Sequence, residues 1–403
     1  MDFAFTHKQE KLGKDVREFI ANNLTPGIRE EMGGDGLEEG KRGPKVQELY
    51  KKIAERGWIG IVWPKKYGGQ EGSRIDQYIV EEEFARVGLS VGGAGSGAPA
   101  IMAAGTDAQK EYFIPKLING EIILALGFSE PRGGADLAAL QCRAVRDGDE
   151  YVINGQKTFS TSAHHATHIY LMARTDPDAY RHKGISILLV PIDAPGITIR
   201  PMYTLQNNPK APAGTTYATP QTNEVFLDNV RVPVSCLLGE ENKGWYVGAM
   251  GLNLDRVGAS RYLISVRRDE DIINWVKHNK LDEYAPAKDD AIRDRLAELW
   301  IEAQVSRLMT MRSMSMVERD MPFNYEGSAE KVWSPEHGIK TTEMVTQILG
   351  PYIQLMNGSE EAIEKGIFAH NLLASWVSAN NHGGVQIMRD QVVRRGFGFP
   401  RGY

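Results

Sequence analysis

The sequence has 403 residues, 42% of them hydrophobic and 25% charged, a composition typical of globular proteins and not of disordered or fibrous chains. Its formal net charge is −5 and it contains no Lys/Arg block, which argues against a nucleic-acid-binding protein and against a polybasic membrane surface. A chain of this length is too long to fold around a single small hydrophobic core, so we expect two or three domains or one large composite fold.

The N-terminus and the cysteines indicate the cellular compartment. Residues 1–10 carry charges from the start and lack the apolar segment of a signal peptide. The apolar runs 58–63 and 121–128 are too short to span a bilayer. Cys142 and Cys236 have no metal-ligand spacing, so we expect reduced thiols and no metal site. These features predict a cytoplasmic, bacterial protein without membrane insertion.

Residues 1–123 are predicted to form an N-terminal helical domain. Apolar residues within 1–30 recur at roughly helical intervals, and 44–57 repeats this pattern up to Gly57, a helix stop. The stretch 63–69 combines a proline with two glycines and predicts a turn. Further helices are expected over about 74–90, 97–105 and 107–119.

Residues 124–240 are predicted to form a β-domain, because short β-rich runs alternate there with Asp-Gly and Asn-Gly turns. Helical periodicity returns over 241–403. The predicted organisation is therefore helices, then a β-domain, then helices, an α+β fold. The expected strands are 151–153, 168–173, 185–190, 197–201 and 224–232. The prolines of the last domain are expected in loops: Pro286, Pro322, Pro335 and Pro351.

Four motifs occur in order along the chain. They are Trp63-Pro64 to Gly68-Gly69; Phe128-Ser129-Glu130-Pro131-Arg132-Gly133-Gly134-Ala135-Asp136; Asn154-Gly155-Gln156-Lys157-Thr158-Phe159-Ser160-Thr161; and Phe226 to Pro233 followed by Leu238-Gly239. Together they resemble the acyl-CoA dehydrogenase family over essentially the whole chain. The second is similar to its Thr/Ser-Glu-Pro-x-x-Gly-Ser-Asp loop and the third to Asn-Gly-x-Lys-x-Trp-Ile-Thr. The resemblance implies an N-terminal helical domain, a central β-sandwich or barrel and a C-terminal four-helix bundle.

The resemblance also implies FAD-dependent α,β-dehydrogenation of an acyl-CoA thioester, with electrons passed to an electron-transfer flavoprotein. Short hydroxyl side chains at Ser129 and Thr161 suit the polar edge of a flavin, and Phe159 suits one ring face where the family more often has Trp. The implied cofactor residues also include Phe128, Gln347, Gly350, Gly384 and Gln386. The implied substrate residues are Gly95, Ala135, Arg256 and Gly383.

The catalytic base departs from the family pattern. The family places a glutamate either before the glycine of a late loop, where this chain has His382, or before an arginine on the first helix after the β-domain. The second position is Asp255, followed by Arg256, and it is the expected base. His382 is the alternative candidate for the base. If Asp255 is the base, His382 is expected to be a polar residue beside the α,β-bond of the substrate. The pair His164-His165 is expected to be a turn and not a metal site.

Two further departures concern the cofactor and the substrate. Relatives usually carry Arg-x-x-Phe-Gly after the base helix, whereas residues 266–272 here contain no Phe-Gly. Bacterial relatives acting on steroid side chains also lack it and work as heteromers, and residues 183–190 resemble that branch. Many small residues over 91–100 leave room for a bulky aryl, alicyclic or steroid-derived acyl group, or else form a flexible loop.

Three alternatives stay open at this level. The chain could be a same-fold flavin oxidase similar to nitroalkane oxidase, a non-catalytic partner subunit that completes another chain's FAD site, or a ligand-binding protein without redox chemistry. Because relatives build each FAD site across a subunit boundary, we expect a homo-oligomer, dimer or tetramer, or a heterotetramer with a related subunit.

Overall fold

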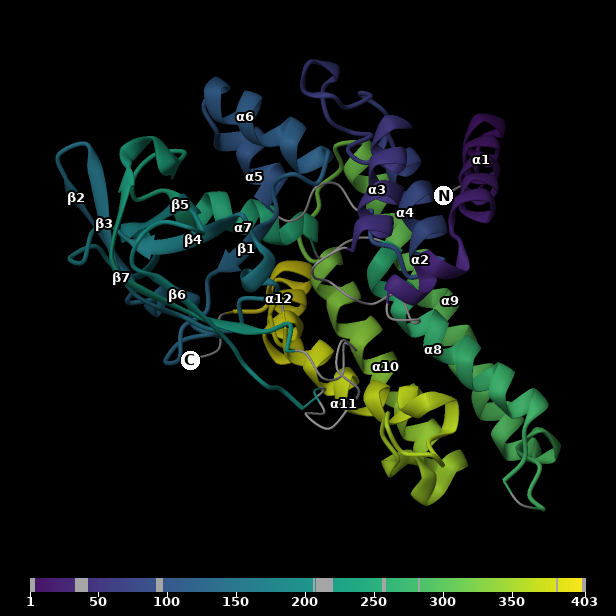
Figure 1. The fold of residues 1–403 in the computed structure, drawn as a ribbon. Coiled ribbons are helices and arrows are strands. Elements are labelled where there is room, and N and C mark those ends of the chain that lie inside the picture. Colours follow the sequence, from purple (N-terminus) through teal and green to yellow (C-terminus); the bar gives the residue numbers. More distant parts are fainter. Residues whose placement is uncertain are drawn as a thin grey trace.

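The computed structural model describes residues 4–32, 43–91, 97–205, 207, 220–255, 259–281, 283–381 and 383–400; the side chains of 30, 250–255 and 259–261 are outside the description. Figure 1 shows the strands gathered on one side and long C-terminal helices running away from them. The N-terminal helices α1 to α4 lie beside one end of these long helices. The fold is the predicted α+β arrangement of helices, sheet and helices.

Helices before the sheet begin where the sequence supplies hydrogen-bonding caps. In α1, the Gln9 amide donates to Thr6 Oγ1 at 3.3 Å, and the Thr6 amide donates to Gln9 Oε1 at 2.9 Å. Thr106 and Gln109 repeat this capping box at the start of α6. The six helices are α1 (His7–Asn23), α2 (Pro26–Glu31), α3 (Pro44–Glu55), α4 (Arg74–Arg86), α5 (Gly97–Ala104) and α6 (Asp107–Ile118).

The described strands form one sheet in the order β6-β7-β3-β2-β4-β5-β8, and β1 pairs in parallel with β4. β3 through β7 cover the five runs predicted as strands. The strands are β1 (Leu124–Gly127), β2 (Arg143–Asp147), β3 (Glu150–Lys157), β4 (His168–Arg174), β5 (Ile185–Pro191), β6 (Ile197–Pro201), β7 (Asn223–Pro233) and β8 (Leu237–Leu238).

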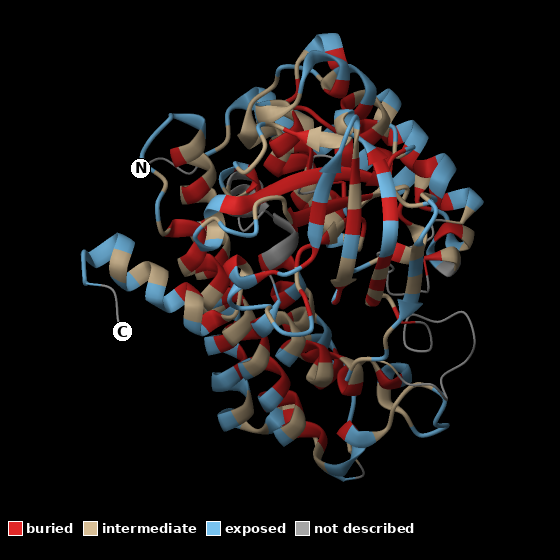
Figure 2. Cartoon of the chain, turned by 90° about the vertical axis from the view of Figure 1, so that its left-hand side faces the viewer, coloured by how far each residue is buried: buried red, intermediate tan, exposed pale blue. Residues whose placement is uncertain are grey.

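Strand β4 is buried on both faces, which explains its nearly continuous apolar sequence. Tyr170 and Met172 point to a core shared with the N-terminal helices, whereas Ile169 and Leu171 point to a second core inside the β-domain. Figure 2 shows the buried residues concentrated along the strands and on the inner sides of the helices. The sheet is therefore the layer on which the N-terminal domain packs.

Helices after the sheet form the C-terminal domain: α7 (Gly244–Asp255), α8 (Ala259–His278), α9 (Asp290–Glu318), α10 (Glu326–Leu349), α11 (Ile367–Asn380) and α12 (Val385–Phe397). The expectation that prolines lie in loops is wrong for Pro335, which lies inside α10. Proline leaves the carbonyl of Lys331 without its helical partner. The helix continues because its buried face is held by neighbours, as where Ser265 of α8 donates to the Ser334 carbonyl at 3.1 Å.

A buried carboxylate joins the N-terminal helices to this bundle. Glu82 of α4 accepts hydrogen bonds from Arg307 Nε of α9 at 2.8 Å and from the Tyr262 hydroxyl of α8 at 2.7 Å. The hydroxyls of Tyr262 and Tyr78 lie 2.8 Å apart. Although burial opposes ionisation, the Arg307 and Tyr262 hydrogen bonds hold the pKa of Glu82 below its usual value. The network fixes α4 against both α8 and α9.

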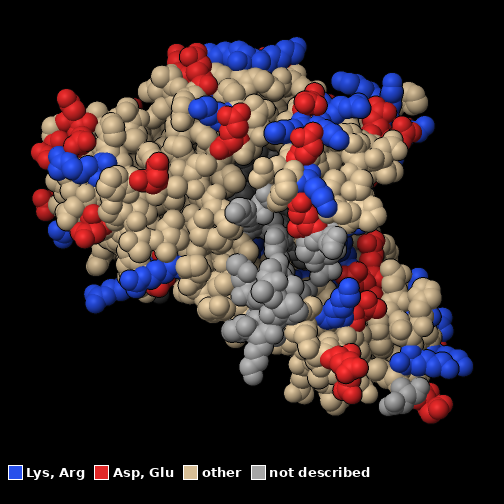
Figure 3. All heavy atoms as spheres, viewed as in Figure 1, with Lys and Arg blue, Asp and Glu red and all other residues tan. Residues whose placement is uncertain are grey.

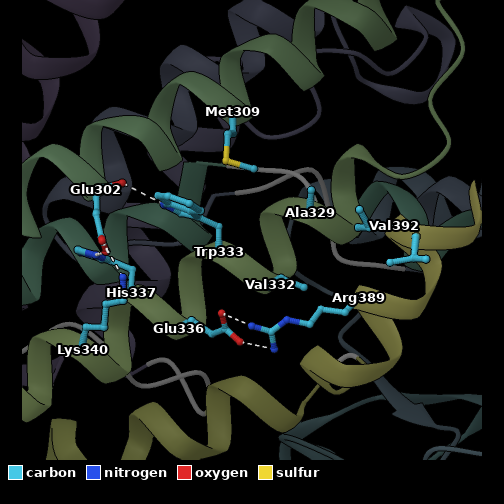
Figure 4. Close-up of a pocket in the computed structure, with 11 residues that line it drawn as sticks. Glu302, Met309, Ala329, Val332, Trp333, Glu336, His337, Lys340, Arg389 and Val392 are labelled. Atoms are coloured by element: carbon cyan, nitrogen blue, oxygen red, sulfur yellow. Dashed lines mark hydrogen bonds and ion pairs between the residues drawn. The ribbon is translucent and has the colours of Figure 1, made fainter. Parts of the chain in front are cut away.

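A buried histidine fixes the bundle itself. His337 of α10 lies between Asp269 of α8, with Nε2 2.8 Å from Oδ2, and Glu302 of α9, with Nδ1 3.2 Å from Oε2. Figure 4 shows His337 beside Glu302. Thr341 donates to the other Asp269 oxygen at 2.7 Å. Burial disfavours the imidazolium, but the hydrogen bonds and charges of the two carboxylates raise the pKa of His337 above its usual value.

This raised pKa predicts a pH dependence of stability. A histidine whose folded pKa exceeds its unfolded value contributes stability that is fully present below about pH 6.5 and is lost as pH rises through the folded pKa. His337→Gln should therefore lower the unfolding free energy at about pH 6 by roughly 2–4 kcal/mol and flatten its decline towards about pH 9, measured by urea denaturation. The exposed His278→Gln on α8 is the control. Identical pH profiles for wild type and His337→Gln would contradict the assignment.

Candidate functional site

Two loops at the ends of β1 and β3 form the candidate flavin site. The loop 128–136 follows β1, and the residues after Lys157 follow β3. The Thr158 amide donates to the Ser129 carbonyl at 2.9 Å, which sets the loops side by side. The structure thereby brings Ser129 next to the segment that carries Phe159 and Thr161.

A fully buried ion pair lies beneath these loops. Lys157 Nζ is 2.8 Å from Glu130 Oε1 and donates to the Phe128 carbonyl at 3.2 Å. The remaining acceptor capacity of Glu130 is used by the amides of Gln141 at 2.6 Å and Cys142 at 2.9 Å. A buried ion pair is tolerated when each charge is hydrogen-bonded in this way. The pair therefore fixes three segments at one point: the 128–136 loop, the end of β3 and the start of β2.

Phe159 is exposed although it is large and apolar. Its side chain is 62% exposed, and its backbone has φ of +56°, a left-handed conformation that is costly for a bulky residue. Its neighbour Ser160 holds this geometry, because the Ser160 amide donates to the Asn223 carbonyl at 3.0 Å and Asn223 Nδ2 donates back to the Ser160 carbonyl at 3.0 Å. Backbone strain maintained by neighbouring bonds is typical of a functional loop.

Buried polar atoms without a hydrogen-bond partner gather under the same loop. Within the described residues they include Ser160 Oγ, both ring nitrogens of His164, Gln221 Oε1 and Asn223 Oδ1. Desolvation lowers the pKa of His164, and the adjacent Asn223 only partly offsets this lowering. His164 belongs to a short 3₁₀ turn, Ala163–His165, as expected, and no group of three or more potential metal ligands occurs in the described part of the chain. Sequence reasoning missed this cluster because its members approach only after folding.

Phe128 is buried, unlike the exposed residues of the loop that follows it. The Phe128 ring is buried in the core, 5.3 Å from the Tyr170 ring, so only its backbone is available to a cofactor. Ala135 is exposed within the 128–136 loop. Phe159 and Thr161, both exposed, present the aromatic face and the hydroxyl that suit a flat heteroaromatic ring with a polar edge. The residues of this site therefore fit a flavin.

The remaining cofactor predictions fall on the C-terminal helices. Gln347 is exposed near the end of α10 and accepts from Arg295 Nη1 at 3.0 Å, and Gly350 ends that helix with φ of +53°. Gly383 has φ of +95°, and Gly384 is the N-cap of α12, two residues before the exposed Gln386. No described hydrogen bond or ion pair joins these residues to the Phe159 loop. Gly95, Arg256 and His382 lie outside the described residues, and of Asp255 only the backbone, at the end of α7, is described.

A cavity of about 360 Å³ lies elsewhere, between α9, α10 and α12 (Figure 4). None of the predicted site residues lines it. Its walls combine apolar side chains with the Glu336–Arg389 and Glu302–Lys340 ion pairs.

In Figure 3, acidic and basic side chains are interspersed over the visible face. Of the described helices, none is long and apolar enough to cross a membrane.

Comparisons with known proteins identify the family to which this chain belongs. The chain matches family models described as the acyl-CoA dehydrogenase N-terminal domain over residues 6–121, middle domain over 125–219 and C-terminal domain over 242–397. The chain therefore belongs to the acyl-CoA dehydrogenase family and is an oxidoreductase of that family. The family is flavin-dependent, generally with FAD.

Among the similar proteins, acyl-CoA dehydrogenase FadE26 of Mycobacterium tuberculosis is 32% identical, with 100% of this chain and 99% of the relative covered. A solved structure titled "Tcur3481-Tcur3483 steroid ACAD" superposes with a TM-score of 0.84 at 31% identity, covering 100% of both chains. The ChsE4-ChsE5 complex from Mycobacterium tuberculosis superposes with a TM-score of 0.83 at 30% identity, again covering 100% of both chains.

Removing the buried cation tests whether the ion pair positions the site. Lys157→Met leaves Glu130 buried with backbone amides alone, so the unfolding free energy should fall by about 3 kcal/mol. The FAD dissociation constant should rise at least about tenfold, because displaced loops lose the geometry of their hydrogen bonds. Denaturation and flavin-fluorescence titration measure the two effects. Arg231→Met, which removes exposed ion pairs on the same domain, should leave both unchanged. Unaltered FAD affinity in Lys157→Met would show that the pair does not fix the loops.

Proposed function

We propose that this chain is an FAD-dependent dehydrogenase that oxidises the α,β-bond of an acyl-CoA thioester carrying a bulky aryl, alicyclic or steroid-derived acyl group. The observation that carries the proposal is the locked pair of loops that presents Phe159 and Thr161 beside Ser129. FAD bound there supplies the acceptor for the β-hydrogen, taken as hydride at flavin N5. The protein would act in the bacterial cytoplasm, and the electrons would pass to an electron-transfer flavoprotein.

Asp255 is the proposed base that removes the α-proton. It is the last residue of α7, the first helix after the sheet, and α7 contacts both α5 and β5. A carboxylate can take this proton when it reaches the α-carbon in a site that excludes water. Because aspartate is one methylene shorter than glutamate, the acyl group must lie closer to the helix. His382 is proposed as a polar neighbour in the turn before Gly383.

The bulky substrate is supported by the chain's relatives, whereas the described small residues of the predicted pocket wall are closely packed. Residues 97–100 of the predicted pocket wall form the first turn of α5, and 92–96 lie outside the described residues. Gly97 is tightly packed, because an added Cβ would lie 2.5 Å from Leu124 Cδ1. One similar structure is titled a steroid dehydrogenase of this family. We therefore place the acyl pocket between α5 and α7, with Gly95, Ala135, Arg256 and Gly383 as substrate residues.

Oligomerisation is proposed from apolar side chains that a monomer would leave in water. Ile301 and Leu308, two turns apart on α9, are 63% and 44% exposed. Phe397 on α12 is 72% exposed, and Figure 2 shows the chain ending in a helix that projects from the body of the molecule. Exposed apolar surface of this kind marks a protein interface. The partner is a second copy or a related subunit, since two similar structures are titled as pairs of chains.

A non-catalytic role in such a pair is the second candidate. Residues 266–272, where relatives have Arg-x-x-Phe-Gly, lie within α8, and Asp269 of this segment is used by His337 and Thr341. Burial also lowers the pKa of Arg268 to about 10. This segment is thus engaged inside the bundle, which supports contacts to the FAD adenine half that differ from those of relatives. A purified chain that is colourless until a related subunit is added would favour this candidate.

The activity is tested by an acyl-CoA panel read as anaerobic bleaching of the flavin absorbance. Steroid-derived, alicyclic or aryl thioesters should bleach the wild type faster than straight-chain thioesters. Asp255→Asn should retain FAD and thioester binding yet reduce its flavin at least about a thousandfold more slowly, because general base catalysis is lost. The exposed Glu240→Gln, near the start of the same helix, should behave as wild type.

The opposite outcomes are equally informative. Normal flavin bleaching in Asp255→Asn would reject Asp255 as the base. Loss of bleaching in His382→Ala would then identify His382 as the base. Rapid reoxidation of the reduced enzyme by oxygen would identify a flavin oxidase on this fold and reject the dehydrogenase assignment.

The interface is tested by placing charge on it. Ile301→Asp combined with Leu308→Asp should lower the particle mass measured by sedimentation, because burying two carboxylates in an apolar contact is unfavourable. Glu298→Ala, an exposed polar change on the same helix, should leave the mass unchanged. An unchanged mass in the double variant would place the interface on another surface.

A further inference from the structure

Lys331 of α10 is a buried cation whose hydrogen bonds converge on the turn between α11 and α12. The residue is only 3% exposed. Its Nζ donates to the Ser378 carbonyl at 2.5 Å and to Asn381 Oδ1 at 3.0 Å. Ser378 lies in the last turn of α11, and Asn381 is the first residue after that helix. The ammonium group therefore holds both the end of α11 and the start of the turn.

The physical reason for this placement is the end of a helix. The last carbonyls of a helix lack intrahelical partners and carry partial negative charge, so a cation there is favourable. The side chains of α10 that line the cavity in Figure 4 are Ala329, Val332, Trp333, Glu336, His337 and Lys340. At 3.6 residues per turn, position 331 lies on the opposite side of the helix. Lys331 thus directs its charge towards α11.

A second bond from the same helix holds the far side of the turn. Ser328 of α10, one turn before Lys331, donates to Gln391 Oε1 of α12 at 2.9 Å. Between these two anchors the chain passes through Gly383, in a left-handed conformation, to Gly384, the N-cap of α12. Helix α10 therefore contacts the chain on both sides of the glycines, at Asn381 before them and at Gln391 after them.

We propose that Lys331 is a positioning residue that fixes the Asn381–Gly384 turn against the reacting end of the thioester. This inference rests on the proposed function, which assigns Gly383 to the substrate and Gly384 to the cofactor. Replacing the ammonium by an apolar group leaves the Ser378 carbonyl and the Asn381 amide without this donor. The chain then loses its anchor to α10 on the Asn381 side and keeps only the Ser328–Gln391 bond, while the Phe159 loops, held by Lys157 and Glu130, are untouched.

Three variants separate positioning from packing. Lys331→Met removes the cation at similar volume, and Lys331→Arg keeps a cation at this position. Thr341→Val is the matched control, since Thr341 is also buried on α10 but donates hydrogen bonds to Asp269 of α8 and to the His337 carbonyl of its own helix. Each protein is prepared with whatever subunit it purifies with. Hydrogen–deuterium exchange over 376–384, FAD content, and flavin reduction by the best thioester of the panel are then compared.

Lys331→Met should exchange faster over 376–384 and reduce its flavin roughly a hundredfold more slowly at unchanged FAD content, the loss typical of a misplaced reacting group. Lys331→Arg should recover most of the rate. Thr341→Val should lose thermal stability, but its hydrogen exchange over 376–384 and its rate of flavin reduction should match those of the wild type. Unchanged exchange in Lys331→Met, or equal losses of rate in Lys331→Met and Thr341→Val, would overturn the inference. If no thioester reduces the flavin of the wild-type protein, the proposed function is rejected instead. The hydrogen-exchange comparison still decides whether Lys331 fixes the turn.

Discussion

The ion pair between Lys157 and Glu130 is the interaction on which the candidate site depends. It is buried beneath two loops from different strands, and further hydrogen bonds go to both charges, so removing one partner would leave the other charge buried and unpaired. Because Glu130 also accepts two backbone amides at the start of β2, a displacement of one loop would disturb the other. The exposed hydroxyl and aromatic groups above it are thereby held in place before any ligand arrives, which reduces the entropy lost on binding.

Two other buried charged residues fix the positions of whole helices, as the Lys157–Glu130 pair fixes the positions of two loops. Glu82 ties the N-terminal helix α4 to α8 and α9, and His337 ties α8, α9 and α10 to one another. Buried ionic groups contribute little net stability but select one arrangement of the helices over others. The chain therefore uses apolar packing to hold its layers together and polar contacts to set their relative positions, including that of α10, which carries Lys331.

The sequence was sufficient for the fold and for the position of the two loops, because both depend on local signals. Short β-rich runs between turns marked β3 to β7, and turn residues marked the loops around Ser129 and Phe159. It was insufficient for contacts between distant segments, such as His337 with Asp269 or Ser160 with Asn223, which no periodicity encodes. Pro335 was misplaced because tertiary packing overrides helix propensity. The domain limits at 123/124 and 240/241 stay predictions, as do the roles of Asp255 and His382.

The left-handed backbone at Phe159 has a consequence for how this enzyme can change. Glycine or asparagine would adopt that conformation with less strain, so a screen that rewards thermal stability alone should select them there. Each would remove the aromatic face that the loop presents. Phe159 is thus a residue that the folded chain by itself does not favour, and stabilised laboratory variants of this enzyme should keep position 159 fixed.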